Sequence, residues 1–274
     1  MVTKLAVGLA AFAVVLAGCS STKEGAPGPA PKPRTKAKAA RPSPSKPRIV
    51  RPHNGSVPIL MYHVVGTPPP AAPFPDLYVS RADFALQLAW LHAHGYHAVS
   101  LFRVYEYWKR GYALPPRPIV LTFDDGYAED FTNVRPLLAA RHWPGVLNLA
   151  VRNLLDGKLT VTQIRRMIRQ GWEVDAHTIN HVDLTTLGAS ELRHEVGGSR
   201  AWIRRRFHVP TDFFCYPSGR YNARVLAAVR AAGFLGATIE GAGAASPRDD
   251  LLTLPRIRVD RSDGVSGLAA KLGG

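Results

Sequence analysis

The sequence predicts an α/β domain whose parallel strands close into a barrel, and three observations support this fold class. Short apolar and β-branched runs alternate with amphipathic helical segments from about residue 55 onward, an alternation typical of parallel α/β folds. No G-x-G-x-x-G turn follows a strand, although an open nucleotide-binding sheet would carry one. Polar residues directly follow several strands, which is where barrel enzymes place their catalytic groups.

The predicted strands are short runs of apolar and β-branched residues that end at turn-forming residues. Successive strands are separated by a helical pattern or a long connection, as a parallel sheet requires. The strands cover residues 57–65, 117–123, 145–151, 172–178, 211–217, 235–240 and 252–259.

Four further segments have the apolar spacing of amphipathic helices. The first places Phe84, Leu88 and Leu91 on one face. The second begins with Thr160 and Gln163, which form the pattern of a capping box. The helices cover residues 80–95, 159–171, 189–207, with a break expected at the glycine pair 197–198, and 222–233.

The charge of the chain is concentrated at its beginning. The 274 residues are enough for one large domain with its own core or for two small ones. The formal net charge is +15, and residues 1–53 carry +9 of it because they contain ten Lys/Arg and one acidic residue. This basic tail indicates an anionic environment, such as a membrane or an acidic wall polymer.

The first residues have the pattern of an export signal. Lys4 precedes an apolar stretch at 5–17 that is too short to span a bilayer comfortably. Leu-Ala-Gly-Cys at 16–19 resembles the lipobox of bacterial lipoproteins, which implies cleavage before Cys19 and attachment of lipid to it. An ordinary signal peptide with a chance cysteine is the alternative. The only other cysteine is Cys215, so the mature protein is expected to have no intrachain disulfide.

These features divide the chain into three segments. We predict a lipoprotein signal peptide at 1–18, a lipidated basic tether at 19–54 and a catalytic domain at 55–274. The tether is rich in Pro, Ala and Lys/Arg, a composition that cannot form a core. The protein is therefore expected to be exported and lipid-anchored to the cell membrane. Nucleic acid is not a predicted partner, because zinc-finger spacing and RNA-binding aromatic motifs are absent.

The residues that could carry chemistry follow four of the predicted strands. Two imidazoles four residues apart and a carboxylate are a common ligand set for a divalent metal, and three protein ligands leave a position open for water. A cation would also explain adjacent aspartates, because one can bind it while the other accepts a proton. These residues are His63, Asp124, Asp125, His177, His181, Tyr216, Pro217 and Gly219.

Each motif has another interpretation when it is taken alone. Asp-Asp-Gly is a common turn, two histidines at this spacing occur on helix surfaces, and a single histidine at a strand end is often structural. A glycosidase is a further alternative, but its two carboxylates lie roughly 5 to 9 Å apart on separate segments, whereas Asp124 and Asp125 are adjacent. The combination of motifs at the strand ends of one domain favours the metal site.

The motifs LTFDDGY (121–127) and HTINH (177–181) resemble those of the NodB-type polysaccharide deacetylases, carbohydrate esterase family four. The resemblance covers roughly residues 57–260 and implies a distorted (β/α) barrel that removes acetyl groups from N-acetylated sugars in a metal-dependent reaction. It implies that Asp124 is the general base. It also implies that the metal ligands are Asp125, His177 and His181.

The third motif departs from the usual family pattern. FFCYPSGRYN (213–222) lacks the arginine that orients the base, and no Asp-Trp or Leu-x-His motif follows it. Together with the early PILMYH block, it resembles the exported poly-N-acetylglucosamine deacetylases, whose motif order is circularly permuted. That resemblance implies that His63 is the general acid and that Arg256 replaces the missing arginine, with an ordinary surface arginine as the alternative. A backbone N–H near Tyr216, beside Pro217, is expected to hold the oxyanion.

The predicted function is metal-dependent hydrolysis of N-acetyl groups from an extracellular or cell-wall polysaccharide that contains N-acetylglucosamine, giving acetate and a free amino sugar. The ligand set suits Zn²⁺, and Co²⁺ or Ni²⁺ would fit by ligand type. The polymer stays open between an exopolysaccharide, peptidoglycan and chitin-like oligomers, and the chain is expected to act as a monomer. The alternative is a non-catalytic cell-wall or sugar-binding lipoprotein with a degenerate site.

Overall fold

The computed structural model describes residues 53–273. The signal peptide, Cys19 and nearly all of the predicted tether lie outside the described residues. The described chain belongs to one unit, Arg48–Gly274, and the described residues form two hydrophobic clusters. None of the helices in this range is long and apolar enough to cross a bilayer.

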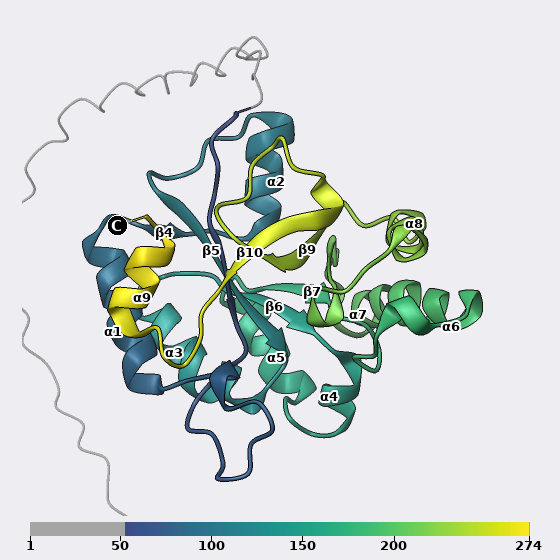
Figure 1. The fold of residues 1–274 in the computed structure, drawn as a ribbon, viewed down its shortest axis with the longest axis horizontal. Coiled ribbons are helices and arrows are strands. Elements are labelled where there is room, and N and C mark those ends of the chain that lie inside the picture. The colour runs from purple at the N-terminus through teal and green to yellow at the C-terminus, as the bar shows by residue number, and fades with distance from the viewer. Residues whose placement is uncertain (1–52, 274) are drawn as a thin grey trace, which may run out of the picture. The chain divides into compact units, whose positions relative to one another are not determined.

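Seven parallel strands close into a barrel, as the sequence predicts (Figure 1). The ring closes because β1 pairs with β5 on one side and with β10 on the other. Outside the ring, β4 (His97–Ala98) lies beside the start of β5, and β2 (Val64–Val65) pairs with β3 (Tyr78–Val79). In ring order the strands are β1 (Ile59–Tyr62), β5 (Pro118–Asp125), β6 (Val146–Leu149), β7 (Glu173–Ala176), β8 (Phe213–Cys215), β9 (Gly236–Gly241) and β10 (Leu254–Arg258).

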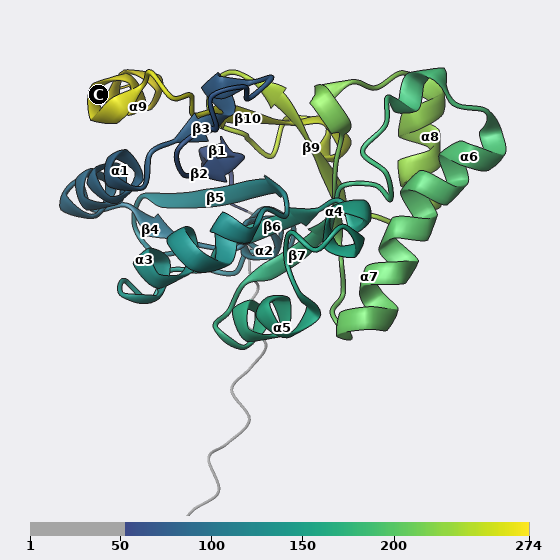
Figure 2. The same ribbon diagram turned by 90° about the horizontal axis from the view of Figure 1, so that it is seen from below.

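Helices surround the barrel (Figure 1 and Figure 2). The first predicted helix is α1, and its Phe84, Leu88 and Leu91 are completely buried. The predicted capping box of Thr160 and Gln163 opens α5. The helices α2, α3, α4 and α9 were not predicted. The α-helices are α1 (Arg81–Ala93), α2 (Leu101–Arg110), α3 (Arg135–Ala139), α4 (Val151–Leu155), α5 (Val161–Arg169), α6 (Ala189–Arg193), α7 (Ser199–Phe207), α8 (Ala223–Ala231) and α9 (Gly264–Lys271).

The break predicted at the glycine pair 197–198 is wrong. A π-helical turn, His194–Gly198, joins α6 to α7, and Gly198 keeps right-handed helical backbone angles. Such a wider turn admits an extra residue without ending the helix and is often found near functional sites. Here the turn buries Glu195.

Alternation along the strands determines which side chains enter the barrel. On β5, Leu121 and Phe123 pack in the outer cluster with the helices, whereas Val120 packs in the inner cluster. Because strand side chains alternate, Thr122 and Asp124 also face the interior, toward the carboxyl ends of the strands. The inner cluster takes one residue from each of five strands, Ile59, Val120, Val146, Phe213 and Leu254, and includes Leu101, Val104 and Trp108 of α2. The helix α2 therefore closes the amino end of the barrel.

Candidate active site

A cleft of about 500 Å³ opens at the carboxyl ends of the strands. Of the residues predicted to bind metal or substrate or to act in catalysis, all but Pro217 line it, and Pro217 is buried in the turn after β8. The structure therefore brings together residues from β1, β5 and β10 and from the loops after β7 and β8. The predicted residues in the lining are His63, Asp124, Asp125, His177, His181, Tyr216 and Arg256.

The two adjacent aspartates both face the cleft because β5 ends in a left-handed turn. In a regular strand, consecutive side chains point to opposite faces, so Asp125 would point away from the site that Asp124 enters. Instead, φ is 75° at Asp125 and 86° at Gly126, a conformation that aspartate tolerates and glycine adopts freely. The side chain of Asn153 holds this turn by donating from Nδ2 to the carbonyl oxygen of Asp125 at 3.1 Å.

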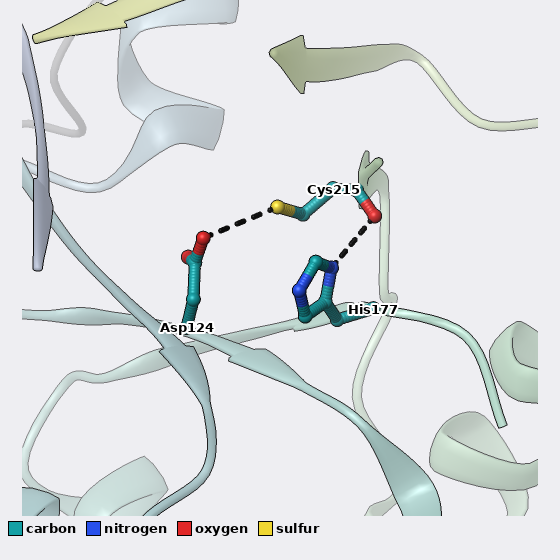
Figure 3. A group of neighbouring side chains, drawn as sticks. All are labelled: Asp124, His177 and Cys215. Carbon is teal, nitrogen blue, oxygen red and sulfur yellow. Dashed lines mark hydrogen bonds between the residues drawn. The ribbon is translucent and has the colours of Figure 1, made fainter. Parts of the chain in front are cut away.

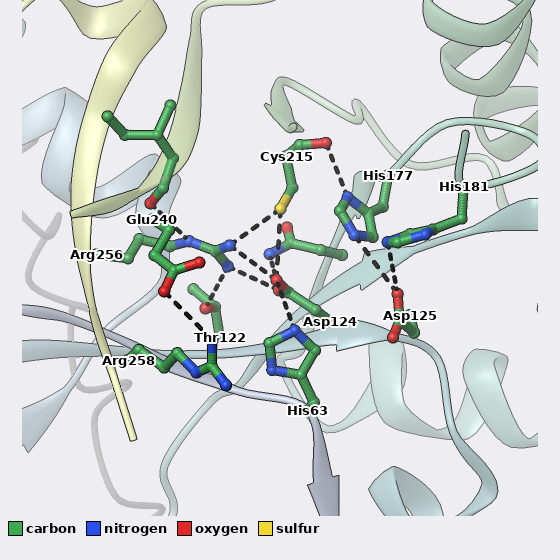
Figure 4. Close-up of polar contacts among 12 residues, drawn as sticks. His63, Thr122, Asp124, Asp125, His177, His181, Cys215, Glu240, Arg256 and Arg258 are labelled. Atoms are coloured by element: carbon green, nitrogen blue, oxygen red, sulfur yellow. Dashed lines mark hydrogen bonds and ion pairs between the residues drawn. The ribbon is translucent and has the colours of Figure 1, made fainter. Parts of the chain in front are cut away.

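Asp124 is held by a buried arginine from β10 (Figure 4). Arg256 donates from Nη1 to Oδ1 and from Nη2 to Oδ2, each at 2.7 Å, and Asn148 Nδ2 donates to Oδ1 at the same distance. Arg256 is 1% exposed, so the alternative of an ordinary surface arginine is wrong. Burial alone would raise the pKa of Asp124, but the charge and hydrogen bonds of Arg256 outweigh it and hold that pKa well below its usual range. Asp124 is therefore ionised at any ordinary pH.

Asp125 pairs with no arginine or lysine within the described residues. Its Oδ1 is buried and accepts no hydrogen bond from the described residues. It faces Nε2 of His181 at 3.2 Å and Nε2 of His177 at 3.5 Å (Figure 4). The three donor atoms lie within 4.8 Å of one another. A buried carboxylate oxygen that faces two imidazoles and accepts no hydrogen bond fits a divalent cation.

A backbone carbonyl group of β8 fixes the orientation of the His177 ring. Its Nδ1 lies 2.8 Å from the carbonyl oxygen of Cys215, which places the proton on Nδ1 and leaves Nε2 as the metal-binding atom. Burial alone would lower the pKa of His177, but Cys215 and Asp125 outweigh it and raise that pKa well above its usual value. Burial, followed by the charge of His177, lowers the pKa of His181. Without a cation, protonation of His177 is therefore more favourable than that of a free histidine.

The segment that carries both histidines is a loop and not a helix. Thr178 and His181 have φ values of 71° and 56°, and the Thr178 hydroxyl accepts a hydrogen bond from the His181 N–H at 2.8 Å. Glu195, in the π-helical turn, accepts hydrogen bonds from the N–H groups of Ile179 and Asn180, both at 2.9 Å. These bonds fix the loop between the two histidines.

A second group of donor atoms, from Asp124, His177 and Cys215, also lies within 4.8 Å (Figure 3). These atoms are already engaged. Arg256 bonds both oxygens of Asp124 and lies 3.2 Å from Sγ of Cys215. A cation here would lie beside the guanidinium group. The group around Asp125 is therefore the better metal site.

His63 follows β1 directly into the cleft. Its Nε2 lies 4.0 Å from Oδ2 of Asp124, because β1 runs beside β5 with Tyr62 opposite Phe123. Burial lowers the pKa of His63, although the charges of Asp124 and Asp125 act in the opposite direction. The imidazole is thus within reach of the carboxylate and releases its proton more readily than a free histidine does.

The predicted oxyanion donor is not the N–H of Tyr216. That N–H donates to the carbonyl oxygen of Thr238 in the barrel at 3.2 Å, and Pro217 has no N–H to offer. Ser218 has φ of 53°, and this turn brings Ser218 and Gly219 to the wall of the cleft. A backbone donor near Tyr216 would have to come from this turn.

Four residues of the site were not found from the sequence: Asn148, Asn153, Glu195 and Cys215. Asn148 and Cys215 carried a signal, because each is a polar or polarisable residue at an inward position of a predicted strand. Glu195 carried another, since it stands on the apolar side of its helix between Leu192 and Ser199, both of them buried. A charged residue in such a position needs a hydrogen-bond partner inside the protein.

Fold and site together define the class of this protein, a (β/α)-barrel hydrolase with carboxylates and imidazoles at the carboxyl ends of its strands. Residues 111–237 match the sequence profile of the family described as polysaccharide deacetylase. This chain therefore carries a polysaccharide deacetylase domain, and this domain and the structural neighbours indicate a polysaccharide N-deacetylase. The family is metal-dependent, and its substrates are N-acetylated polysaccharides.

Individual relatives agree with this family. A Bacillus subtilis protein assigned to the polysaccharide deacetylases is 29% identical over 215 residues, which cover 78% of this chain and 74% of that protein. The poly-β-1,6-N-acetyl-D-glucosamine N-deacetylase of Escherichia coli K12 is 40% identical over 95 residues, covering 35% of this chain and 14% of that one. A Streptococcus pyogenes deacetylase, solved with acetate, superposes with a TM-score of 0.75 at 26% identity, covering 80% of this chain and 99% of the other.

Proposed function

We propose that this protein removes acetyl groups from a polysaccharide containing N-acetylglucosamine, outside the cytoplasm and with a divalent cation at Asp125, His177 and His181. The observation that carries the proposal is the buried Oδ1 of Asp125, which accepts no hydrogen bond from the described residues and faces both imidazoles. In the same cleft, Asp124 and His63 provide a proton acceptor and a proton donor.

The cation would supply chemistry that side chains cannot. Bound at this site, it would act as a Lewis acid toward the acetyl carbonyl and would lower the pKa of water to about 7. Two imidazoles and one carboxylate are typical of Zn²⁺, while Co²⁺ and Ni²⁺ fit by ligand type.

In the proposed reaction, Asp124 accepts the proton of the attacking water. Arg256 keeps it ionised, so the acceptor is available at any ordinary pH. The same ion pair makes Asp124 a weak base, and the proton can pass on to His63, whose Nε2 is 4.0 Å from Oδ2. Protonated His63 then donates to the nitrogen as the C–N bond breaks. The water oxygen stays on the acetyl carbon, and the products are acetate and a free amine.

The substrate and the location rest on different observations. Relatives in Escherichia coli and Staphylococcus aureus are named poly-β-1,6-N-acetyl-D-glucosamine N-deacetylases, which favours an exopolysaccharide over peptidoglycan or chitin-like oligomers. The signal pattern at 1–19 supports the proposal that the protein is exported, lipidated at Cys19 and anchored in the membrane. We propose that the protein acts there as a monomer.

The test compares metal-free and Zn²⁺-loaded protein on three substrates. Residues 48–274 would be incubated with β-1,6-linked and β-1,4-linked N-acetylglucosamine oligomers and with peptidoglycan, and acetate release would be measured. We expect acetate from the β-1,6 oligomers only when metal is present. Acetate from peptidoglycan alone would reassign the substrate, and equal acetate release without metal would contradict the proposed mechanism.

The His63→Gln variant tests the role of the histidine. Because an amine leaves poorly without a proton, turnover should fall by about 10² to 10⁴-fold. Metal content should stay unchanged, because His63 is not among the proposed ligands. A variant with normal turnover would remove His63 from the mechanism.

A further inference from the structure

One wall of the cleft is apolar, whereas most of its lining is polar. Apart from two tyrosines and a glycine, the other residues that line the cleft are polar or charged. The apolar side chains come from one segment of the chain, because one lies on β1 and two lie on the connection from β2 to β3. We call them the apolar wall, and they are Met61, Phe74 and Leu77.

Phe74 is the exposed member of the apolar wall. It is 68% exposed, whereas Met61 is buried and Leu77 is partly buried. Single exposed apolar residues are ordinary on a protein surface. Five large hydrophobic residues are exposed within residues 53–273, and Phe74 is the one that lines the cleft; the other four are Leu86, Tyr112, Leu155 and Tyr221. The ring of Phe74 therefore offers apolar surface to a ligand in the cleft.

The connection that carries Phe74 is held in place. Five prolines in residues 66–77 restrict its backbone, because each proline fixes its own φ. The Leu77 N–H donates to the carbonyl oxygen of Phe74 at 3.2 Å, and the Arg261 N–H donates to that of Asp76 at 3.0 Å. A ring that is held before binding loses little conformational freedom when a ligand covers it.

The apolar wall lies on the same side of the barrel as His63. Met61 precedes His63 by two residues, and the connection that contains the rest of the wall begins three residues after His63. The two histidines of the proposed metal site follow β7, which is three strands from β1 in one direction around the ring and four in the other. The wall and His63 therefore lie on one side of the cleft, and the two ligand imidazoles lie across from them.

The proposed reaction decides which part of the substrate meets this wall. The acetyl group has to lie at the proposed metal site, while the nitrogen has to lie within reach of His63, so the sugar attached to that nitrogen is on the side of His63. A pyranose ring has an apolar face of C–H groups, which an aromatic ring can cover, and hydroxyl groups at its edge that need polar partners. Glu240 on β9 and Arg258 on β10 both reach solvent in the same cleft and offer such partners.

We propose that the ring of Phe74 stacks on the pyranose ring that carries the leaving nitrogen and holds this sugar beside His63. The inference rests on the proposed deacetylase function and deepens it, because it assigns a residue that binds the sugar and not the acetyl group. The apolar face of the pyranose ring is common to all the candidate polymers, so this contact selects for a sugar and not for a linkage.

Binding is tested first, on the full chain without metal, so that no turnover occurs. Isothermal titration calorimetry would measure the affinity for a β-1,6-linked N-acetylglucosamine disaccharide and pentasaccharide. Phe74→Ala should bind both about tenfold more weakly, because covering roughly 50 Å² of apolar surface corresponds to a factor of this size. Phe74→Trp should restore the affinity, since it keeps an aromatic face. The melting temperature should not change, because Phe74 is exposed.

The matched control is Tyr112→Ala, which removes an aromatic ring that is 50% exposed and does not line the cleft. This variant should bind the oligomers as the wild type does. Equal affinities of wild-type and Phe74→Ala protein would overturn the proposal, as would wild-type protein that binds neither oligomer. A loss confined to the pentasaccharide would place the ring against a neighbouring sugar and overturn its position beside the leaving nitrogen. Unchanged oligomer affinity together with lost binding to lipid vesicles would assign the ring to a membrane instead.

Kinetics of the Zn²⁺-loaded protein separate this contact from the chemistry. A stacked sugar is held equally in the ground state and the transition state, so Phe74→Ala should raise KM about tenfold and leave kcat unchanged. A lower kcat at unchanged KM would contradict this role. Oligomer binding that depends on Phe74, without acetate release from any of these proteins, would contradict the proposed deacetylase function and leave the sugar contact established.

Discussion

The two halves of the cleft are built from adjacent aspartates but differ in how their charge is balanced. Asp124 is paired with a cation, because Arg256 bonds both of its oxygens and Asn148 bonds Oδ1. Asp125 has a buried oxygen that accepts no hydrogen bond from the described residues and faces imidazoles only. The half around Asp124 has its charge balanced within the protein, and we call it the closed half. The half around Asp125 would need a cation from solution to balance its charge, and we call it the open half.

This difference shows how the dipeptide at 124–125 can supply two functions. The sequence makes the aspartates neighbours, and the left-handed turn at Asp125 brings both to one cleft. Their opposite roles come from partners elsewhere in the chain: the guanidinium on β10 for Asp124 and the imidazoles after β7 for Asp125. Substitutions that disrupt one half of the cleft at a time test this difference.

The largest effect is expected from Asp125→Ala. Removing the carboxylate takes away one of three ligands, so bound metal should fall to background and acetate release should become undetectable. The comparison variant is Asp124→Asn, which should bind metal normally and still lose about 10² to 10⁴-fold in turnover. Metal content by elemental analysis separates the two. If both variants lose metal, the division of the cleft into two halves is wrong.

Arg256→Met should have the next largest effect, on stability. It leaves the carboxylate of Asp124 buried without its cation, and breaking a buried pair in this way costs about 3 to 5 kcal/mol. The double variant Asp124→Asn/Arg256→Met should recover much of this loss, because no charge is left behind. The free energy of unfolding in urea measures both.

The control for this pair is Arg258→Met, two residues further along β10. Arg258 forms ion pairs with Glu240 and Asp260 and is partly exposed, so its loss should cost at most about 1 kcal/mol. Equal losses in the free energy of unfolding for the Arg256 and Arg258 variants would mean that the buried ion pair with Asp124 stabilises the fold no more than a surface ion pair does.

The barrel and most of the site could be predicted because they depend on local patterns. Alternating segments predict parallel strands with helices outside, and polar residues at strand ends must meet at one end of a closed barrel. The conformation of the pair at 124–125 could not be predicted, because it depends on a left-handed turn. The residues alone do not indicate the partner of Asp124, since Arg256 lies 132 residues further along the chain, and only the resemblance to the exported deacetylases predicts it. The π-helical turn was missed because its glycines favour a break when only local propensity is considered.

The open half should make the metal-free protein sensitive to pH. The pKa of His177 is raised in the folded protein, so protonation of His177 stabilises the metal-free fold. This stabilisation is fully present below the pKa of about 6.5 in the unfolded chain, and it is lost as pH rises through the pKa in the folded protein. Metal must displace that proton, so its affinity should increase by up to about tenfold per pH unit below the folded pKa. The melting temperature and a chelator competition measure the two effects. The His177→Gln variant should show neither.

The smallest effect is expected from Glu195→Gln. The carboxylate of Glu195 accepts hydrogen bonds from the N–H groups of Ile179 and Asn180. An amide at this position would replace these charge-assisted bonds with weaker ones. Loosening the loop between His177 and His181 should weaken metal binding by roughly 10-fold, the lower end of the range for residues that support metal ligands.

Glu191→Gln is a matched control for this variant, because Glu191 is exposed on α6 and accepts a hydrogen bond from the N–H of Gly188, remote from the ligands. Chelator competition should separate the two variants, while their urea unfolding should differ little. Equal metal affinities would show that the loop holds its shape without Glu195. The open half would then be preorganised by the backbone conformation of Thr178 and His181 and not by the buried carboxylate.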